Sequence, residues 1–111
     1  VCPKCNSETR PHVLWFDEYY NEYHYHLLEV LRIAKETGLL IIAGTSGATN
    51  LPRRIVENTL NRQGIVIDIN PNENEFTKHL NKIKNGYIVK YKSSIALAEL
   101  RKLIEENFKK K

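Results

Sequence analysis

Two cysteines near the start of the sequence have the spacing of a metal-binding knuckle. Cys2 and Cys5 are the only cysteines among the 111 residues, and two residues separate them. This spacing is typical of tetrahedral zinc sites, and a structural zinc needs four ligands. The histidines that could complete such a site are His12, His24, His26 and His79. We expect instead that the other two ligands lie upstream. The alternative is a thioredoxin-type redox pair, which needs a helix at residues 6–9, where no helical pattern is visible.

Three polar loops carry side chains that could bind a nucleotide or a substrate. Gly44–Gly47 combines glycines with two hydroxyl side chains, so a ribose or phosphate can approach its backbone closely. This motif lacks the glycine fingerprint of dinucleotide-binding folds and is also consistent with a helix N-cap. In Asn70–Asn72, Asn70 can hydrogen-bond to ribose hydroxyls or simply begin a turn. The third loop, Phe16–Glu18, follows a run of β-branched and aromatic residues.

Strands and helices that alternate along the chain must position these loops. The predicted strands are 12–16, 39–43, 65–69 and 87–91, and the predicted helices are 21–37, 51–62 and 95–108. The run at 39–43 (LLIIA) has no polar residue, so we expect it to be buried on both faces. Gly38 is expected to be the C-cap of the helix before it. The polar segment 73–85 has no predicted element.

The alternation predicts an α/β fold, a Rossmann-like parallel sheet with helices on both faces. Consecutive parallel strands are joined by right-handed crossovers. Ligands of such sheets bind at the carboxyl ends of the strands, where the loops lead into the next element. The three polar loops are therefore the predicted binding region.

Composition and charge limit the classes of function. Hydrophobic residues are 41% and charged residues 27%, which is typical of a folded chain, and the length allows at most one domain. The net charge of +4 comes from residues 78–111, but no aromatic residues interleave with the basic ones, as a nucleic-acid surface needs. A zinc-bearing nucleic-acid binder, with steep salt dependence, is therefore a minor hypothesis.

Two further expectations concern location. No apolar run has the length of a membrane span, so we expect no membrane partner. A CxxC pair suits a reducing compartment better than a structural disulfide, which favours a cytoplasmic location.

In their order and spacing, these motifs resemble the C-terminal part of the sirtuins, the NAD-dependent protein deacylases. The resemblance is carried by residues 2–5 (CPKC), 10–18 (RPHVLWFDE), 44–46 (GTS) and 69–72 (INPN). It extends from residue 1 to at least Asn72, and Lys92–Ser94 resembles the last nucleotide-contacting loop of the family. Two positions depart from the family pattern: Asp17 replaces a usual glycine, and Pro52 lies one position late.

The resemblance implies a role for each motif. Cys2 and Cys5 would be the second pair of a four-cysteine zinc site. The residues implied for NAD binding are Gly44, Thr45, Ser46, Asn70, Pro71, Asn72 and Ser93. The residues implied for the acyl-lysine peptide are Leu14, Phe16, Asp17 and Glu18, with the peptide added as a strand. The implied organisation is a remnant of a zinc module at 1–9 and part of the NAD-binding domain at 10–111.

The resemblance also implies the reaction. The acyl oxygen displaces nicotinamide from the ribose, and a histidine base then activates a ribose hydroxyl. In the family that histidine and the glycine-rich NAD loop precede the zinc site, and none of the four histidines here matches it. No catalytic residue is therefore assigned, and we expect the isolated chain not to deacylate. The alternative is a non-catalytic nucleotide-binding or assembly module with the same half-fold.

The start of the sequence leads to one more expectation. It begins with Val1 and contains no methionine, so we expect a piece of a larger domain whose N-terminal part is the missing partner. A sheet cut at its middle exposes a strand edge and apolar surface. We therefore expect the isolated chain to be marginally stable or oligomeric.

Overall fold

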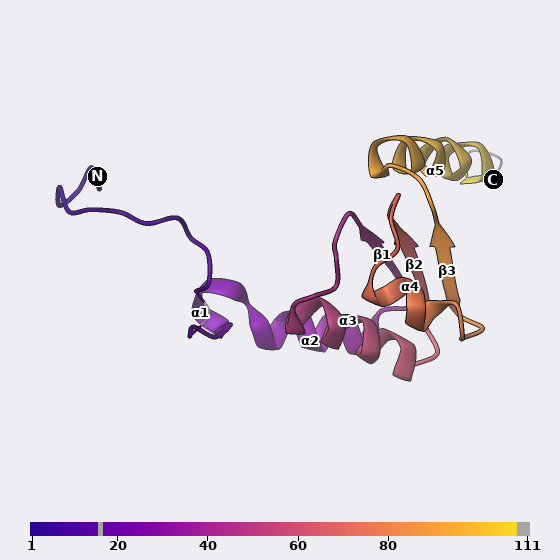
Figure 1. The fold of residues 1–111 in the computed structure, drawn as a ribbon, viewed down its shortest axis with the longest axis horizontal. Coiled ribbons are helices and arrows are strands. Elements are labelled where there is room, and N and C mark those ends of the chain that lie inside the picture. The colour runs from indigo at the N-terminus through magenta and orange to yellow at the C-terminus, as the bar shows by residue number, and fades with distance from the viewer. Residues whose placement is uncertain (16, 109–111) are drawn as a thin grey trace.

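A parallel sheet of three strands organises the chain (Figure 1). The computed structural model describes residues 1–15 and 17–108. The elements are α1 (Glu22–Tyr25), α2 (Leu27–Glu36), β1 (Leu39–Ala43), α3 (Asn50–Asn61), β2 (Ile65–Ile69), α4 (Glu75–Leu80), β3 (Gly86–Val89) and α5 (Ser93–Phe108). The strands lie in the order β1-β2-β3, and both pairs are parallel. The predicted α/β class is confirmed.

Most predicted elements of the second half of the chain are confirmed. The strands at 39–43 and 65–69 have the predicted bounds, and the edge strand predicted at 87–91 is found at 86–89. The helices predicted at 51–62 and 95–108 correspond to α3 and α5. None of the described helices is long and apolar enough to cross a membrane.

The strand predicted at 12–16 is wrong for residues 12–15, and Phe16 lies outside the described residues. Among the described residues, no strand pairs with this segment and receives its backbone hydrogen bonds. It forms tight turns instead: Val13 N–H donates to Pro11 O at 2.9 Å, and Glu18 N–H donates to Trp15 O at 3.1 Å. Residues 12–15 of this β-branched and aromatic run therefore form irregular structure.

The single helix predicted at 21–37 is two helices. His26, between α1 and α2, has a left-handed backbone with φ 48°, which interrupts the helix. The Glu22 carboxylate accepts a hydrogen bond from Leu28 N–H at 2.5 Å and so satisfies a free donor in the first turn of α2. The expected C-cap glycine is also wrong. The C-cap is Thr37, which has an extended backbone and whose hydroxyl donates to Ile33 O at 2.8 Å.

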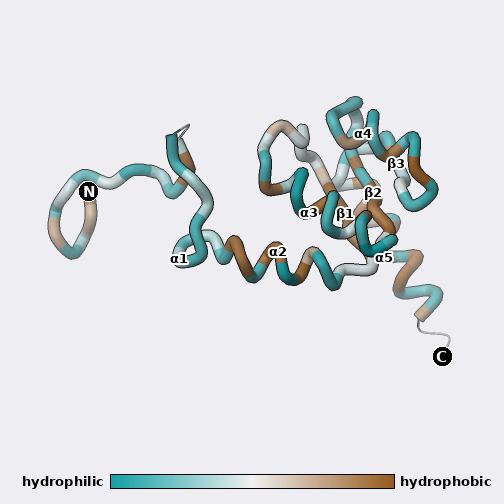
Figure 2. The backbone as a smooth tube through the Cα atoms, turned by 90° about the horizontal axis from the view of Figure 1, so that it is seen from below, coloured by the Kyte–Doolittle hydropathy of each residue, from teal (hydrophilic) through white to brown (hydrophobic). Residues whose placement is uncertain are grey.

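The hydrophobic core lies on one face of the sheet. It is formed by Ile42, Val56, Val66, Phe76 and Leu80. Helices α3 and α4 cover this face, and α2 packs along α3. Figure 2 shows the apolar residues of β1 and β2 at the centre of this part, while the N-terminal segment extends away from it.

The other face of the sheet is open, so the expectation that 39–43 is buried on both faces is wrong. Leu39 is 54% exposed and Ile41 38% exposed. In register with them, Ile65 and Tyr87 are exposed on the same face. Helix α5 approaches only the carboxyl end of this face and leaves a cavity of about 450 Å³ against Ile67, Ile69 and Val89.

Candidate functional site

The Gly44–Gly47 loop leaves β1 at the carboxyl edge of the sheet. Gly44 and Gly47 both have left-handed backbones, with φ 68° and 73°, a conformation that glycine adopts at low cost. Helix α3 begins only at Asn50 with Thr49 as N-cap, so Gly44–Gly47 is not its cap. Two exposed residues of the loop, Gly44 and Ser46, and the half-buried Thr45 lie where a ligand can reach them.

Asn70 joins the two predicted nucleotide loops. Its side-chain Nδ2 donates to Thr45 O at 3.0 Å, and its Oδ1 accepts from Asn72 N–H at 3.2 Å. A further bond runs from Gly44 N–H in the first loop to Ile69 O, at the end of β2 and just before the second loop, at 3.1 Å. Asn70 is therefore both a turn residue and a bridge, and the loops lie side by side.

Helix α4 was missed by the sequence analysis, and its N-terminus lies under both loops. The Asn74 side chain accepts hydrogen bonds from Phe76 N–H at 2.7 Å and from Thr77 N–H at 3.1 Å. The Thr77 hydroxyl in turn accepts from Asn74 N–H at 3.1 Å and completes a capping box. An asparagine followed three residues later by a threonine was the signal that could have revealed this helix.

Phe76 connects α4 to the first loop. A Cβ at Gly47 would lie 2.8 Å from Phe76 Cε2, so the ring occupies the space that a side chain would fill. Glu75 N–H also donates to Ser46 O at 3.4 Å. The conformation of the first loop therefore depends on the position of α4.

Ser93, the last residue predicted for nucleotide binding, is the first residue of α5. The segment before it is tied to the second loop, since Lys90 Nζ lies 3.1 Å from Glu73 Oε1 and Asn70 N–H donates to Val89 O at 3.1 Å. Ser93 therefore follows the strand next to Asn70–Asn72, at the same edge of the sheet.

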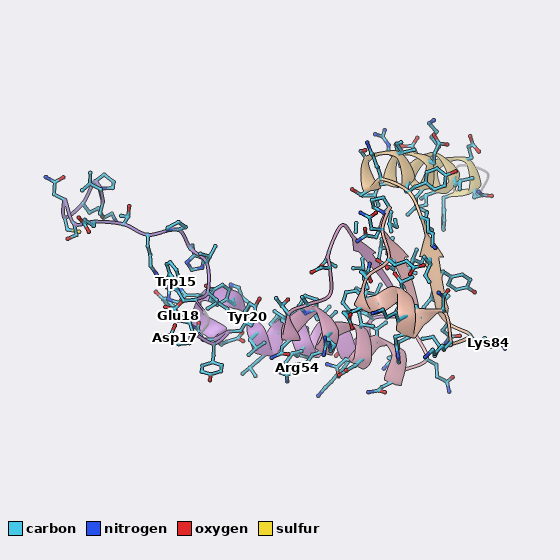
Figure 3. The ribbon with its side chains drawn as sticks, in the orientation of Figure 1. Trp15, Asp17, Glu18, Tyr20, Arg54 and Lys84 are labelled. Atoms are coloured by element: carbon cyan, nitrogen blue, oxygen red, sulfur yellow. The ribbon has the colours of Figure 1, made fainter. Side chains whose placement is uncertain are left out.

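The residues predicted for the peptide lie on the N-terminal segment. Leu14 and Glu18 line a cavity of about 670 Å³ whose other wall is Ala48–Asn50, at the start of α3. Figure 3 shows Trp15, Asp17, Glu18 and Tyr20 gathered beside α1. Asp17 is exposed and does not line the cavity. The structure thus places Leu14 and Glu18 next to the segment that follows the Gly44–Gly47 loop.

An ion pair fixes the turn that carries these residues. Arg10 Nη2 donates to both carboxylate oxygens of Glu18, at 2.7 and 2.9 Å, and Trp15 N–H donates to the same carboxylate at 3.0 Å. The hydrogen bond from Arg10, with that from Trp15 N–H, lowers the pKa of Glu18 below its ordinary value. Sequence reasoning missed this pair, because eight residues separate its members along an irregular segment.

This geometry predicts a pH-dependent change in the environment of Trp15, the only tryptophan in the chain. The pKa of Glu18 is lower in the folded chain than in the unfolded chain. The ionised Glu18 carboxylate therefore stabilises the fold at pH values above the pKa that Glu18 has in the unfolded chain. That effect is lost as the pH falls through the lowered value. Tryptophan fluorescence is therefore expected to change in this acidic range, and Glu18→Gln should remove the transition. A transition of equal size in Glu18→Gln would contradict this role.

The cysteine pair lies in a turn at residues 3–5. Asn6 N–H donates to Cys2 O at 2.9 Å, and Asn6 has a left-handed backbone with φ 60°. Hydrogen bonds between Cys5 and the Ser7 side chain and backbone, and between Cys5 and Cys2, lower the pKa of the Cys5 thiol, which favours the thiolate that binds metal. The pair fits two of the four positions of a structural zinc. Within residues 1–15 and 17–108, no group of three or more potential metal ligands is present.

The known proteins to which this chain is similar carry the same functional name. The chain is 31% identical over 106 residues, 96% of its length, to an NAD-dependent protein deacylase of Leptospira interrogans serovar Lai. It is 29% identical over 106 residues to the corresponding deacylase of serovar copenhageni. Over 69 residues, 62% of the chain, it is 36% identical to an NAD-dependent protein deacylase of Pyrococcus furiosus. The chain corresponds to the C-terminal part of a sirtuin.

This sirtuin chain spans 40% of the length of each Leptospira relative and 27% of the Pyrococcus relative. No protein-family model and no solved structure matches it. All three relatives are named NAD-dependent protein deacylases. Their names do not favour the alternative hypothesis of a non-catalytic module.

Proposed function

We propose that this chain is the C-terminal section of an NAD-dependent protein-lysine deacylase and contributes part of the NAD site and of the acyl-lysine site. The observation that carries the proposal is the bridge from Asn70 to Thr45, which holds two loops side by side at the carboxyl edge of a parallel sheet. In α/β folds this edge is where nucleotides bind.

Each group of residues has a task in this proposal. Gly44, Thr45 and Ser46 bind the nicotinamide ribose and the phosphates, since two of them carry hydroxyls and the glycine leaves open space beside its backbone. The adenosine is held by Asn70, Pro71, Asn72 and Ser93. The peptide is held by Leu14, Phe16, Asp17 and Glu18.

Two of these peptide residues, Leu14 and Glu18, meet the start of α3 in one cavity. The acyl group would therefore reach the nicotinamide ribose from the side of the N-terminal segment. Residues 10–111 form part of the NAD-binding domain in this proposal. Residues 1–9 belong to a zinc module, in which Cys2 and Cys5 hold half of a structural zinc that stabilises the fold rather than reacts. A cytoplasmic location stays a prediction from the thiol pair.

The nucleotide site can be tested with ADP-ribose and the full 111-residue chain. In an NMR titration, the shifts of backbone amides are expected to change mainly at 44–46, at 70 and 72, and at Ser93. Asn70→Ala should weaken binding about 10-fold, because it removes the bridge that orders both loops. Asn61→Ala, at the exposed end of α3, is the matched control and should bind as the wild type does.

Two outcomes would overturn the proposal. One is the absence of shift changes in these loops at saturating ADP-ribose. The other is equal weakening in Asn61→Ala and Asn70→Ala, since the effect would then be unrelated to the bridge. When NAD and an acetyl-lysine peptide are added to this chain alone, release of nicotinamide should also be undetectable. Robust deacylation would show that the chain holds a complete catalytic site.

A further inference from the structure

The central strand buries a carboxyl side chain that no step of the proposed reaction uses. Asp68 is 0% exposed and lies in the middle of the sheet, between Ile42 of β1 and Ile88 of β3. Its Oδ2 accepts hydrogen bonds from Asn74 Nδ2 at 2.8 Å and from the Thr77 hydroxyl at 3.2 Å. Its Oδ1 has no hydrogen-bond partner among the described residues. An apolar residue would fit this strand better, so the carboxyl group needs a reason.

The partners of Asp68 connect it to both predicted nucleotide loops. Asn74 lies in the connection that follows Asn70–Asn72, and its side-chain oxygen caps α4. The cap places Phe76, whose ring fills the space beside Gly47 in the first loop. A continuous series of contacts therefore runs from Asp68 through Asn74 and Phe76 to the backbone of the first loop.

Asp68 selects one of the two orientations of the Asn74 amide. With Nδ2 donating to Asp68, Oδ1 faces the N–H groups of Phe76 and Thr77. The opposite orientation would direct an NH₂ group at these donors and lose the cap. Because α4 has only six residues, it has little helical stability of its own and depends on this cap and on packing.

We propose that Asp68 is a positioning residue for the nucleotide site, which holds both loops in place through the capping side chain of α4. The inference rests on the proposed function, because the loops matter as a pair only if they bind one nucleotide. Asp68 itself does not touch the ligand, since it is fully buried beneath α4.

Four variants separate positioning from stability alone. Asp68→Val removes both acceptor oxygens, while Asp68→Asn keeps an oxygen that can accept from Asn74 and Thr77. Val66→Ala is the matched control, because Val66 is equally buried on the same face of β2 but belongs to the apolar core. Thr77→Val removes one of the two donors to Asp68, together with the acceptor of Asn74 N–H in the capping box, and serves as a second variant if Asp68→Val does not fold.

The first measurement needs no ligand. Hydrogen exchange of the amides of Gly44, Phe76 and Thr77 is compared with exchange of the β2 amides in each variant. Asp68→Val is expected to accelerate the first group about 10-fold relative to the second, because two bonds to a buried carboxyl group are lost. Thr77→Val should show the same pattern with a smaller change. Val66→Ala should accelerate both groups together, and Asp68→Asn should change neither by more than about 3-fold.

The second measurement is the ADP-ribose affinity of the folded molecules. Asp68→Val is expected to weaken it about 10-fold, with Asp68→Asn and Val66→Ala close to the wild type. Wild-type affinity and an unchanged exchange ratio in Asp68→Val, or in Thr77→Val if the former is unfolded, would overturn the inference. If the wild type does not bind ADP-ribose, the proposed nucleotide site fails. The rate of hydrogen exchange at Gly44, Phe76 and Thr77, relative to the rate at the β2 amides, then decides alone whether Asp68 positions the loops.

Discussion

Gly86→Ala is expected to lower the free energy of unfolding by about 3 kcal/mol. A Cβ at Gly86 would lie 2.5 Å from Leu80 O and 2.9 Å from Leu80 Cα. Both are backbone atoms, so no change of rotamer relieves the contact. Gly86 is also paired with Val66 in the sheet, so β3 can move away from α4 only by disturbing its register with β2.

Gly38→Ala is the matched control, because it adds the same methyl group just before β1. No atom lies within 4 Å of the added Cβ, and Gly38 does not have a left-handed backbone. Its free energy of unfolding should therefore stay within about 0.5 kcal/mol of the wild type. Urea denaturation followed by circular dichroism measures both variants. Equal stability of Gly86→Ala and Gly38→Ala would show that β3 and α4 are not packed as described.

The sequence predicted those elements that a local signal marks, such as a bounded apolar run. The apolar runs at β1 and β2 have turn or glycine residues at both ends, and their bounds are as predicted. The helix predicted at 21–37 failed because periodicity does not report a single left-handed residue, here His26. Helix α4 was missed because its short polar sequence is stabilised by a cap and by burial of Phe76 and Leu80.

Burial of the sheet faces depends on distant residues and could not be read from β1. A run of five apolar residues fits a strand covered on both sides, and it also fits a strand covered on one side. Which case holds depends on where α5 lies, and that position is set after β3, about fifty residues later in the sequence. The sequence therefore predicted the strand but not its exposed face.

The candidate site was predicted in its location but not in its connections. Parallel topology brings the loops after β1 and β2 to one edge, which was foreseeable from strand order. The bridge from Asn70 to Thr45 and the buried group of Asp68, Asn74 and Thr77 depend on side-chain geometry across the fold. Asp68 resembled an ordinary polar residue at a strand end, because burial cannot be seen in a single sequence.

The open face of the sheet is expected to make the isolated chain self-associate. It presents Leu39, Ile41, Ile65 and Tyr87 side by side, and β1 is an edge strand beside it. Burial of one such side chain contributes about 1.5–3 kcal/mol, so a second copy that covers several of them gains enough to associate. Sedimentation velocity over a range of concentrations is expected to show species larger than the monomer. A monomer at every concentration would contradict this expectation.

Leu39→Lys combined with Ile41→Lys should weaken this association about 100-fold or more, because two apolar contacts are lost and two charges would be buried at the contact. Both positions are exposed, so the free energy of unfolding should change by less than about 1 kcal/mol. The control is Tyr23→Lys combined with Leu28→Lys, which adds the same charge at side chains 86% and 68% exposed on α1 and α2. If the control dissociates the chain equally well, net charge rather than the sheet face determines association. If only the pair on β1 does so, the open face is the contact surface.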